Sequence, residues 1–87
     1  MHAAALLAEA LELVRRCDYQ IREEDLEGAG GGHCSFAGKK WLLLDITQSP
    51  QQQLEDAVDA LRCEPILRQL SLSPPLAALL SGAKRAA

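Results

Sequence analysis

The chain has 87 residues and a formal net charge of −3, which is enough for one domain over residues 1–87, with a core over 1–70 and a helical tail over 71–87. Hydrophobic residues make up 48% and charged residues 24%, a balance that excludes a disordered chain. Only 3% of residues are aromatic and no run of Lys or Arg exceeds two, so the stacking platforms and basic face of a nucleic-acid-binding protein are missing.

Residues 3–17 have the apolar spacing of an amphipathic helix. The stripe consists of Leu7, Leu11 or alternatively Ala10, Val14 and Cys17, and Leu6 and Leu13 widen it. Glu9 and Glu12 interrupt the apolar run, and no basic region precedes it, so this segment differs from a secretory signal. No segment approaches the roughly 18 apolar residues of a membrane span. The sequence therefore predicts a packing helix in a cytoplasmic protein that binds no membrane.

Residues 19–32 predict a short strand followed by an acidic turn and a glycine-rich connector. Residues 19–23 alternate as a strand does, and the carboxylates over 23–27 favour a solvated turn over a contact for a basic partner or a cation. Successive amides at Gly30, Gly31 and Gly32 can form an anion nest. A phosphate loop, however, needs a helix start behind it, and here a strand follows. The pattern favours a connector.

Residues 33–46 predict a β-hairpin. Gly38-Lys39 as a two-residue loop suits a type II′ turn and pairs Ala37 with Lys40. In that register one face carries Cys34, Phe36, Trp41, Leu43 and Asp45, and the other carries His33, Ser35, Leu42, Leu44 and Ile46. A strand that is apolar on both sides is normally buried on both sides. One face is expected to meet helices, and the other needs the C-terminal helices or a second copy of the chain.

Asp45 ends the second hairpin strand, opposite Gly32 in the expected register. A carboxylate at this position can accept hydrogen bonds from loop amides, including those of the glycine run, so a structural role is expected first. The candidate interaction or structural site comprises Gly30, Gly31, Gly32, His33, Cys34, Trp41 and Asp45.

A second helix is predicted over residues 50–62. Ser49 fits the N-cap, Pro50 the first helical position, and Gln52 completes a capping box. The apolar stripe is formed by Leu54, Ala57, Val58 and Leu61.

The C-terminal part predicts short helices. Pro65 interrupts the helical pattern. The residues after it indicate a helical turn through Ile66, Leu67 and Leu70. Ser73 and Pro74 start a further helix that Gly82 ends, and residues 84–87 are an expected frayed tail.

The chain offers no clear catalytic or metal-binding constellation. His33 and Cys34 are adjacent on a strand and therefore point to opposite faces, which excludes a Cys–His pair between them. A zinc site would need ligands drawn from Cys17, Cys34, Cys63, His2 and His33, and their wide spacing is typical of separate buried thiols in a reducing compartment. Glu55 and Asp59 share a helix face, where solvation keeps both charged. No catalytic residue, metal ligand or cofactor is expected.

The hairpin region resembles a group of small uncharacterised bacterial proteins. The matching residues are Gly30-Gly31-Gly32-His33-Cys34, then Gly38-Lys39-Lys40-Trp41-Leu42-Leu43-Leu44-Asp45, then Gln53-Leu54. The resemblance covers residues 19–62 and implies no known activity, so it assigns no catalytic residue.

The element order helix, strand, hairpin, helix is also similar to the front half of compact zinc-dependent peptidases. In that family the helix after the hairpin carries His-Glu-x-x-His. The corresponding residues here are Gln51-Gln52-Gln53-Leu54-Glu55-Asp56-Ala57, which contain no histidine, so the metal ligands of that family are missing.

Together these features predict an α+β fold: an N-terminal helix, a small three-stranded antiparallel sheet with a hairpin, a capped helix and short C-terminal helices. The two-faced apolar strand predicts a non-enzymatic protein-interaction module that self-associates as a homodimer. The alternative is a small metal- or anion-binding protein that uses Cys and His residues or the glycine-rich loop.

Overall fold

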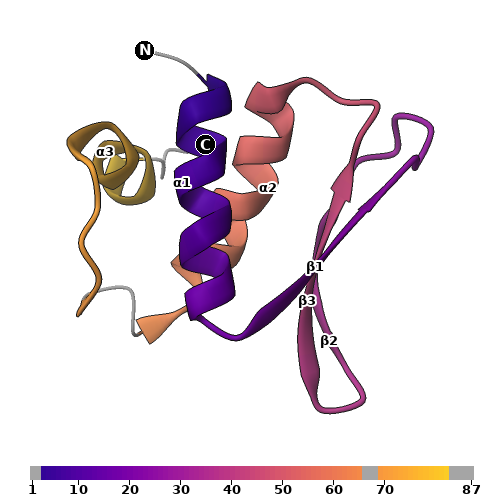
Figure 1. The fold of residues 1–87 in the computed structure, drawn as a ribbon, viewed down its shortest axis with the longest axis horizontal. Helices are drawn as coiled ribbons and strands as arrows, with labels where there is room; N and C mark the ends of the chain where they lie inside the picture. Colours follow the sequence, from indigo (N-terminus) through magenta and orange to yellow (C-terminus); the bar gives the residue numbers. More distant parts are fainter. Residues whose placement is uncertain (1–2, 66–68, 83–87) are drawn as a thin grey trace.

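The computed structural model describes residues 3–65 and 69–82. Its elements are α1 (Ala3–Arg16), β1 (Tyr19–Glu24), β2 (Gly32–Phe36), β3 (Lys39–Asp45), α2 (Pro50–Arg62) and α3 (Pro74–Gly82). The expected α+β class is confirmed. In Figure 1, α1 and α2 lie side by side against the sheet, and α3 lies beyond them. The expected helical turn at Ile66 and Leu67 and the expected fraying over 84–87 fall outside the described residues.

The three strands form a mixed sheet in the order β1-β3-β2. β1 runs parallel to β3, and β2 runs antiparallel to it, so the expectation of a wholly antiparallel sheet is wrong. The physical reason is the connection between β1 and β2. Residues 25–31 carry the chain past the end of β3, because Glu24 pairs with Asp45 while Gly32 pairs with Leu43 on the other side. β3 therefore returns between the two earlier strands.

The β2–β3 hairpin forms with a loop one residue earlier than expected. The loop is Ala37-Gly38, and both residues have positive φ, at 55° and 79°, as in a type I′ turn, which Gly favours at the second loop position. Cys34 therefore pairs with Trp41, where the sequence had predicted Leu43. Asp45 consequently has no partner in β2. The pairing differs by two positions, and because side chains alternate with period two, each residue keeps its expected face.

One face of the sheet is covered by helices and forms the core. Leu42 and Leu44 of β3 are both 0% exposed. They pack in one cluster with Leu6, Ala10, Leu13, Val14, Cys17, Tyr19, Leu54, Ala57, Val58, Ala60, Leu61 and Leu76. The stripe of α1 is centred on Leu6, Ala10 and Leu13, whereas Leu7 and Leu11 are only partly buried at its sides. This face, with Leu42 and Leu44 at its centre, is called the covered face below.

Local signals at the helix starts are present as expected. Ser49 caps α2: its side chain accepts a hydrogen bond from the Gln52 amide, and the Gln52 side chain accepts one from the Ser49 amide, which completes the capping box. At α3, the Ser73 hydroxyl accepts a hydrogen bond from the Leu76 amide at 3.5 Å. Both helix starts were therefore readable from local sequence.

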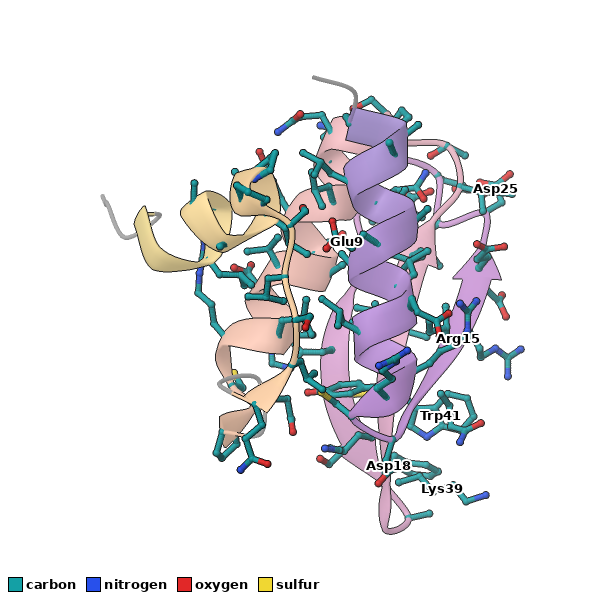
Figure 2. The ribbon with its side chains drawn as sticks, turned by 60° about the vertical axis from the view of Figure 1, so that its left-hand side comes forward. Glu9, Arg15, Asp18, Asp25, Lys39 and Trp41 are labelled. Atoms are coloured by element: carbon teal, nitrogen blue, oxygen red, sulfur yellow. The ribbon has the colours of Figure 1, made fainter. Side chains whose placement is uncertain are left out.

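α3 packs against α1 and α2 and makes no contact with the sheet among the described residues. Glu9 of α1 helps to hold it there, because its carboxylate accepts hydrogen bonds from the Ser73 amide at 2.8 Å and the Ser73 hydroxyl at 2.5 Å. Figure 2 shows Glu9 between α1 and the α3 segment. Of the two alternatives for the second sheet face, coverage by the C-terminal helices therefore does not hold for α3. None of the helices in the described part of the chain is long and apolar enough to cross a membrane.

Candidate interaction face of the sheet

The second face of the sheet is apolar, and none of the described helices covers it. Its side chains line a shallow depression of about 290 Å³ formed by Arg22, Cys34, Phe36, Trp41 and Leu43, which together are called the open face below. Phe36 is 72% exposed, and Trp41 and Leu43 are half-buried. In Figure 1 the described helices all lie on the other side of the sheet. The open face therefore presents two of the three aromatic residues of the chain to solvent.

Charged side chains lie at the rim of the open face. Arg22 and Glu24 lie two residues apart on β1 and therefore share this side of the strand. Their side chains form an ion pair, with the Arg22 Nε donating to Glu24 Oε2 at 2.8 Å. The open face is therefore an apolar surface whose rim carries this ion pair and Lys39, which lies two residues before Trp41 on β3. Figure 2 shows Trp41 beside the strands, near Lys39 at the hairpin end.

The open face ends at Asp45, which is 0% exposed although its position in the strand places it on the uncovered side. The loop after β1 folds over it. Its carboxylate accepts hydrogen bonds from the Leu26, Gly30 and Thr47 amides at 3.0–3.2 Å and from the Thr47 hydroxyl at 2.6 Å. The bond from Gly30 is the contact with the glycine run that the sequence suggested for this residue.

Hydrogen bonding, not burial, sets the ionisation of Asp45. Burial acts most strongly on its pKa and raises it, but the bonds from the Thr47 hydroxyl and from the Gly30, Thr47 and Leu26 amides together outweigh it and lower the pKa to about 2. Asp45 is therefore a carboxylate at neutral pH, and its charge is satisfied by the loops that it joins. Such a group organises structure and is poorly suited to accept a proton in catalysis.

The amides of the glycine-rich segment already have acceptors within the chain. The Gly28 amide donates to Thr47 Oγ1 at 3.0 Å, and the Ala29 amide donates to the Leu26 carbonyl at 3.0 Å. The Gly30 amide donates to Asp45, and the Gly31 amide donates to Asp56 Oδ2 at 3.3 Å. An anion that bound these four amides would have to displace the carboxylates and oxygens that they contact now.

Asp56 differs from Asp45 in its ionisation. Burial raises its pKa, the bond from Gly31 opposes that change, and the charges of Asp59, Glu55 and Asp45 raise the pKa further. Asp56 is thus the less favourably ionised of the two carboxylates at the glycine segment. Asp59 and Glu55 both stay exposed on α2, as the sequence predicted for that pair.

The cysteines and histidines do not converge in the described part of the chain. Cys17 is buried, but Cys34 and Cys63 are exposed, so the expectation of three buried thiols is wrong. Cys34 lies on an edge strand, and Cys63 follows the last turn of α2, where few atoms cover either side chain. Among the described residues no group of three His, Cys, Asp or Glu side chains could hold a metal ion. His2 is outside the described residues.

One polar cluster was not predicted from the sequence. The Tyr19 hydroxyl donates to Glu64 Oε2 at 3.2 Å, and the Lys40 ammonium donates to Glu64 Oε1 at 3.0 Å while lying 4.8 Å from the centre of the Tyr19 ring. Burial, followed by the charge and hydrogen bond of Glu64, raises the pKa of Tyr19 to about 12. The cluster joins residues 45 positions apart and fastens the end of α2 to the sheet, and no local motif marks it.

The structure separates the candidate residues into three locations. Cys34 and Trp41 lie together on the open face, whereas the exposed His33 occupies the opposite side of β2. The other members are Gly30, Gly31, Gly32 and Asp45. They lie at the end of the open face where the loop after β1 folds over Asp45, which is called the closed end below. No protein-family model, curated protein or solved structure matches this chain.

Proposed function

We propose that this chain is a non-enzymatic protein-interaction module that self-associates. The observation that carries the proposal is the open face, where Phe36 is 72% exposed next to the half-buried Trp41 and Leu43. Removing apolar surface from water is favourable by about 25 cal/mol per Å². A contiguous apolar surface on a sheet that no described helix covers therefore favours contact with another protein surface.

The polar groups that a catalytic site would need have structural contacts instead. Asp45 accepts hydrogen bonds from loop amides and from the Thr47 hydroxyl, and Tyr19 donates a hydrogen bond to Glu64. Asp45 thus bonds to nearby Thr47 and to the more distant Leu26 and Gly30, and Tyr19 bonds to the distant Glu64, which supports a role of both side chains in folding.

The alternative, a metal- or anion-binding protein, receives less support from the same observations. His33 and Cys34 point to opposite faces of β2, and the amides of the glycine segment donate to groups of the chain itself. A metal or phosphate that remains bound through native mass spectrometry would nevertheless favour this alternative over self-association.

The proposal is tested by sedimentation of the reduced, metal-free protein over a wide concentration range. A reversible dimer is expected. Phe36→Ser should raise the dimer dissociation constant about tenfold or more, because a buried Phe side chain contributes about 1.5–3 kcal/mol. Ile46→Ser is the matched control, since Ile46 is 55% exposed but is not part of the open face. A monomer at every concentration would contradict the proposal.

A further inference from the structure

The two edges of the sheet differ in charge. β1 and β2 are the edge strands, because β3 lies between them. β1 carries Arg22, Glu23 and Glu24, whereas β2, Gly32–Phe36, contains no Asp, Glu, Lys or Arg. Charged side chains on an edge strand oppose the addition of another strand, and their absence leaves an edge open to pairing. The β2 edge is therefore the edge at which a further strand is accepted more easily.

The register of the hairpin identifies the free backbone groups of β2. A two-residue loop is closed by a hydrogen-bonded pair, here Phe36 with Lys39. Hydrogen-bonded and non-hydrogen-bonded pairs alternate along an antiparallel ladder. Phe36, Cys34 and Gly32 therefore direct their backbone groups toward β3, and His33 and Ser35 direct theirs to the outer edge.

The residues on either side do not extend this free edge. The Gly31 amide already donates to Asp56, and Ala37 lies in the turn with φ of 55°. His33 and Ser35 thus offer four backbone groups, two donors and two acceptors. An identical strand related by a two-fold axis matches all four when His33 faces Ser35 of the second copy, which puts Cys34 opposite itself.

We infer that two copies of this chain pair antiparallel through β2, with Cys34 opposite Cys34 of the second copy, to form one continuous six-stranded sheet. This inference rests on the proposed self-association and specifies its interface. Any other antiparallel register would place His33 or Ser35 opposite a residue without free backbone groups, and some of their donors and acceptors would then lack a partner.

The same register accounts for the exposed side chains of β2. Phe36 lies opposite Gly32 of the second copy, and a Cβ on Gly32 would meet nothing within 4 Å, so there is room for the ring. Pairing of an aromatic side chain across from a glycine covers an otherwise bare stretch of backbone. Phe36 and Cys34 belong to the open face, so this pairing places the part of that face that lies on β2 against the second copy.

Oxidative cross-linking tests the register. Cys34 and its counterpart form a non-hydrogen-bonded pair, with Cα atoms about 4.5 Å apart, which suits a disulfide. In a Cys63→Ser background, diamide removes two protons and two electrons from the two thiols and is reduced to the hydrazine. A covalent dimer linked through Cys34 is expected. A Cys34→Ser, Ser35→Cys version of the same background is the matched control and should cross-link at least tenfold more slowly, because residue 35 faces residue 33.

An edge-blocking variant provides a second measurement. Ser35→Pro removes an amide that makes no bond to β3, so the hairpin keeps its own hydrogen bonds while the outer edge loses a donor. This variant should be monomeric at concentrations where the wild type is a dimer, and circular dichroism checks that it folds. If it does not fold, the cross-linking result decides alone.

The outcomes separate the interface from the self-association itself. A wild-type dimer that neither cross-links through Cys34 nor responds to a folded Ser35→Pro variant overturns the β2 interface and leaves self-association in place. A wild type that stays monomeric at every concentration overturns both.

Discussion

The two faces of β3 carry similar residues but have different surroundings. Leu42 and Leu44 are fully buried on the covered face, whereas Trp41 and Leu43, their neighbours in the strand, are half-buried on the open face. Alternation along a strand determines which side chains share a face, but it does not determine whether anything covers that face. Coverage depends on where the helices pack, and α3 packs against α1 and α2. An apolar pattern alone therefore does not identify a core residue.

The two ends of the open face differ in the same way. At the hairpin end Phe36 is exposed, and at the other end Asp45 is fully buried beneath the loop that follows β1. A charged residue at one end of this face is thus more buried than an aromatic residue at the other end. The hydrogen bonds to Asp45 explain this, because they replace the water that a carboxylate would otherwise need.

The largest expected effect distinguishes the two faces directly. Leu44→Ala should lower the free energy of unfolding by about 2–5 kcal/mol, because it leaves a cavity in the core. Leu43→Ala removes the same atoms from the open face and should cost less than about 1 kcal/mol. Urea unfolding at low protein concentration measures both. Equal losses would mean that the two faces are equally covered.

Asp45→Ala should lower Tm by roughly 10 °C or more, because the Leu26, Gly30 and Thr47 amides lose their acceptor. Asp25→Ala is the control, since Asp25 is an exposed carboxylate of the same loop. Figure 2 labels Asp25 at the outside of the molecule. An unchanged Tm for Asp45→Ala would remove its structural role.

The pH dependence gives a second test of Asp45. Its pKa is lowered from 3.8 to about 2 in the folded chain, so the stability that its charge contributes is complete above about pH 4 and is lost as the pH falls toward 2. Asp45→Ala should therefore lose less additional stability than the wild type over that interval. Thermal unfolding in a series of acidic buffers compares the two slopes, and equal slopes would contradict the assignment.

Gly31 and Gly32 form a matched pair at the closed end. A Cβ on Gly31 would lie 1.8 Å from the Leu43 carbonyl oxygen, so Gly31→Ala must move backbone and should cost about 1–3 kcal/mol. Gly32→Ala has open space and should change stability by less than about 1 kcal/mol in the monomer. Urea unfolding of the dilute proteins separates the variants. A larger loss for Gly32→Ala would contradict the close approach at Gly31.

The smallest expected effect concerns the polar cluster at the edge of the covered face. Tyr19→Phe should lower stability by about 0.5–1.5 kcal/mol through loss of the bond to Glu64. Because Tyr19 is the only tyrosine, its ionisation can be followed by ultraviolet absorbance, with a midpoint near 12. The stability that neutral Tyr19 contributes should be lost as the pH rises from 10 to 12. Glu64→Gln should move the midpoint back toward 10, and an unmoved midpoint would exclude Glu64 as a cause.

Local chemistry in the sequence was sufficient for several features. The Ser49 capping box depends on residues within one helical turn. In the hairpin, side chains alternate between the two faces, so a pairing register that differs by two positions leaves each side chain on its expected face. Even the link between Asp45 and the glycine run followed from the presence of a lone carboxylate at the end of an apolar strand. These features involve short-range geometry or a simple period, so the residues concerned determine them almost alone.

Other features were decided only by the tertiary structure. The parallel pairing of β1 with β3 depends on the path of residues 25–31, and the position of α3 depends on contacts such as that between Glu9 and Ser73. The contact between Tyr19 and Glu64 joins residues 45 positions apart. Pairings of this kind compete with many alternatives of similar local energy, and only the packing of the whole chain selects among them. For the same reason, the sequence predicted an apolar strand, and the fold decided which of its faces remained open.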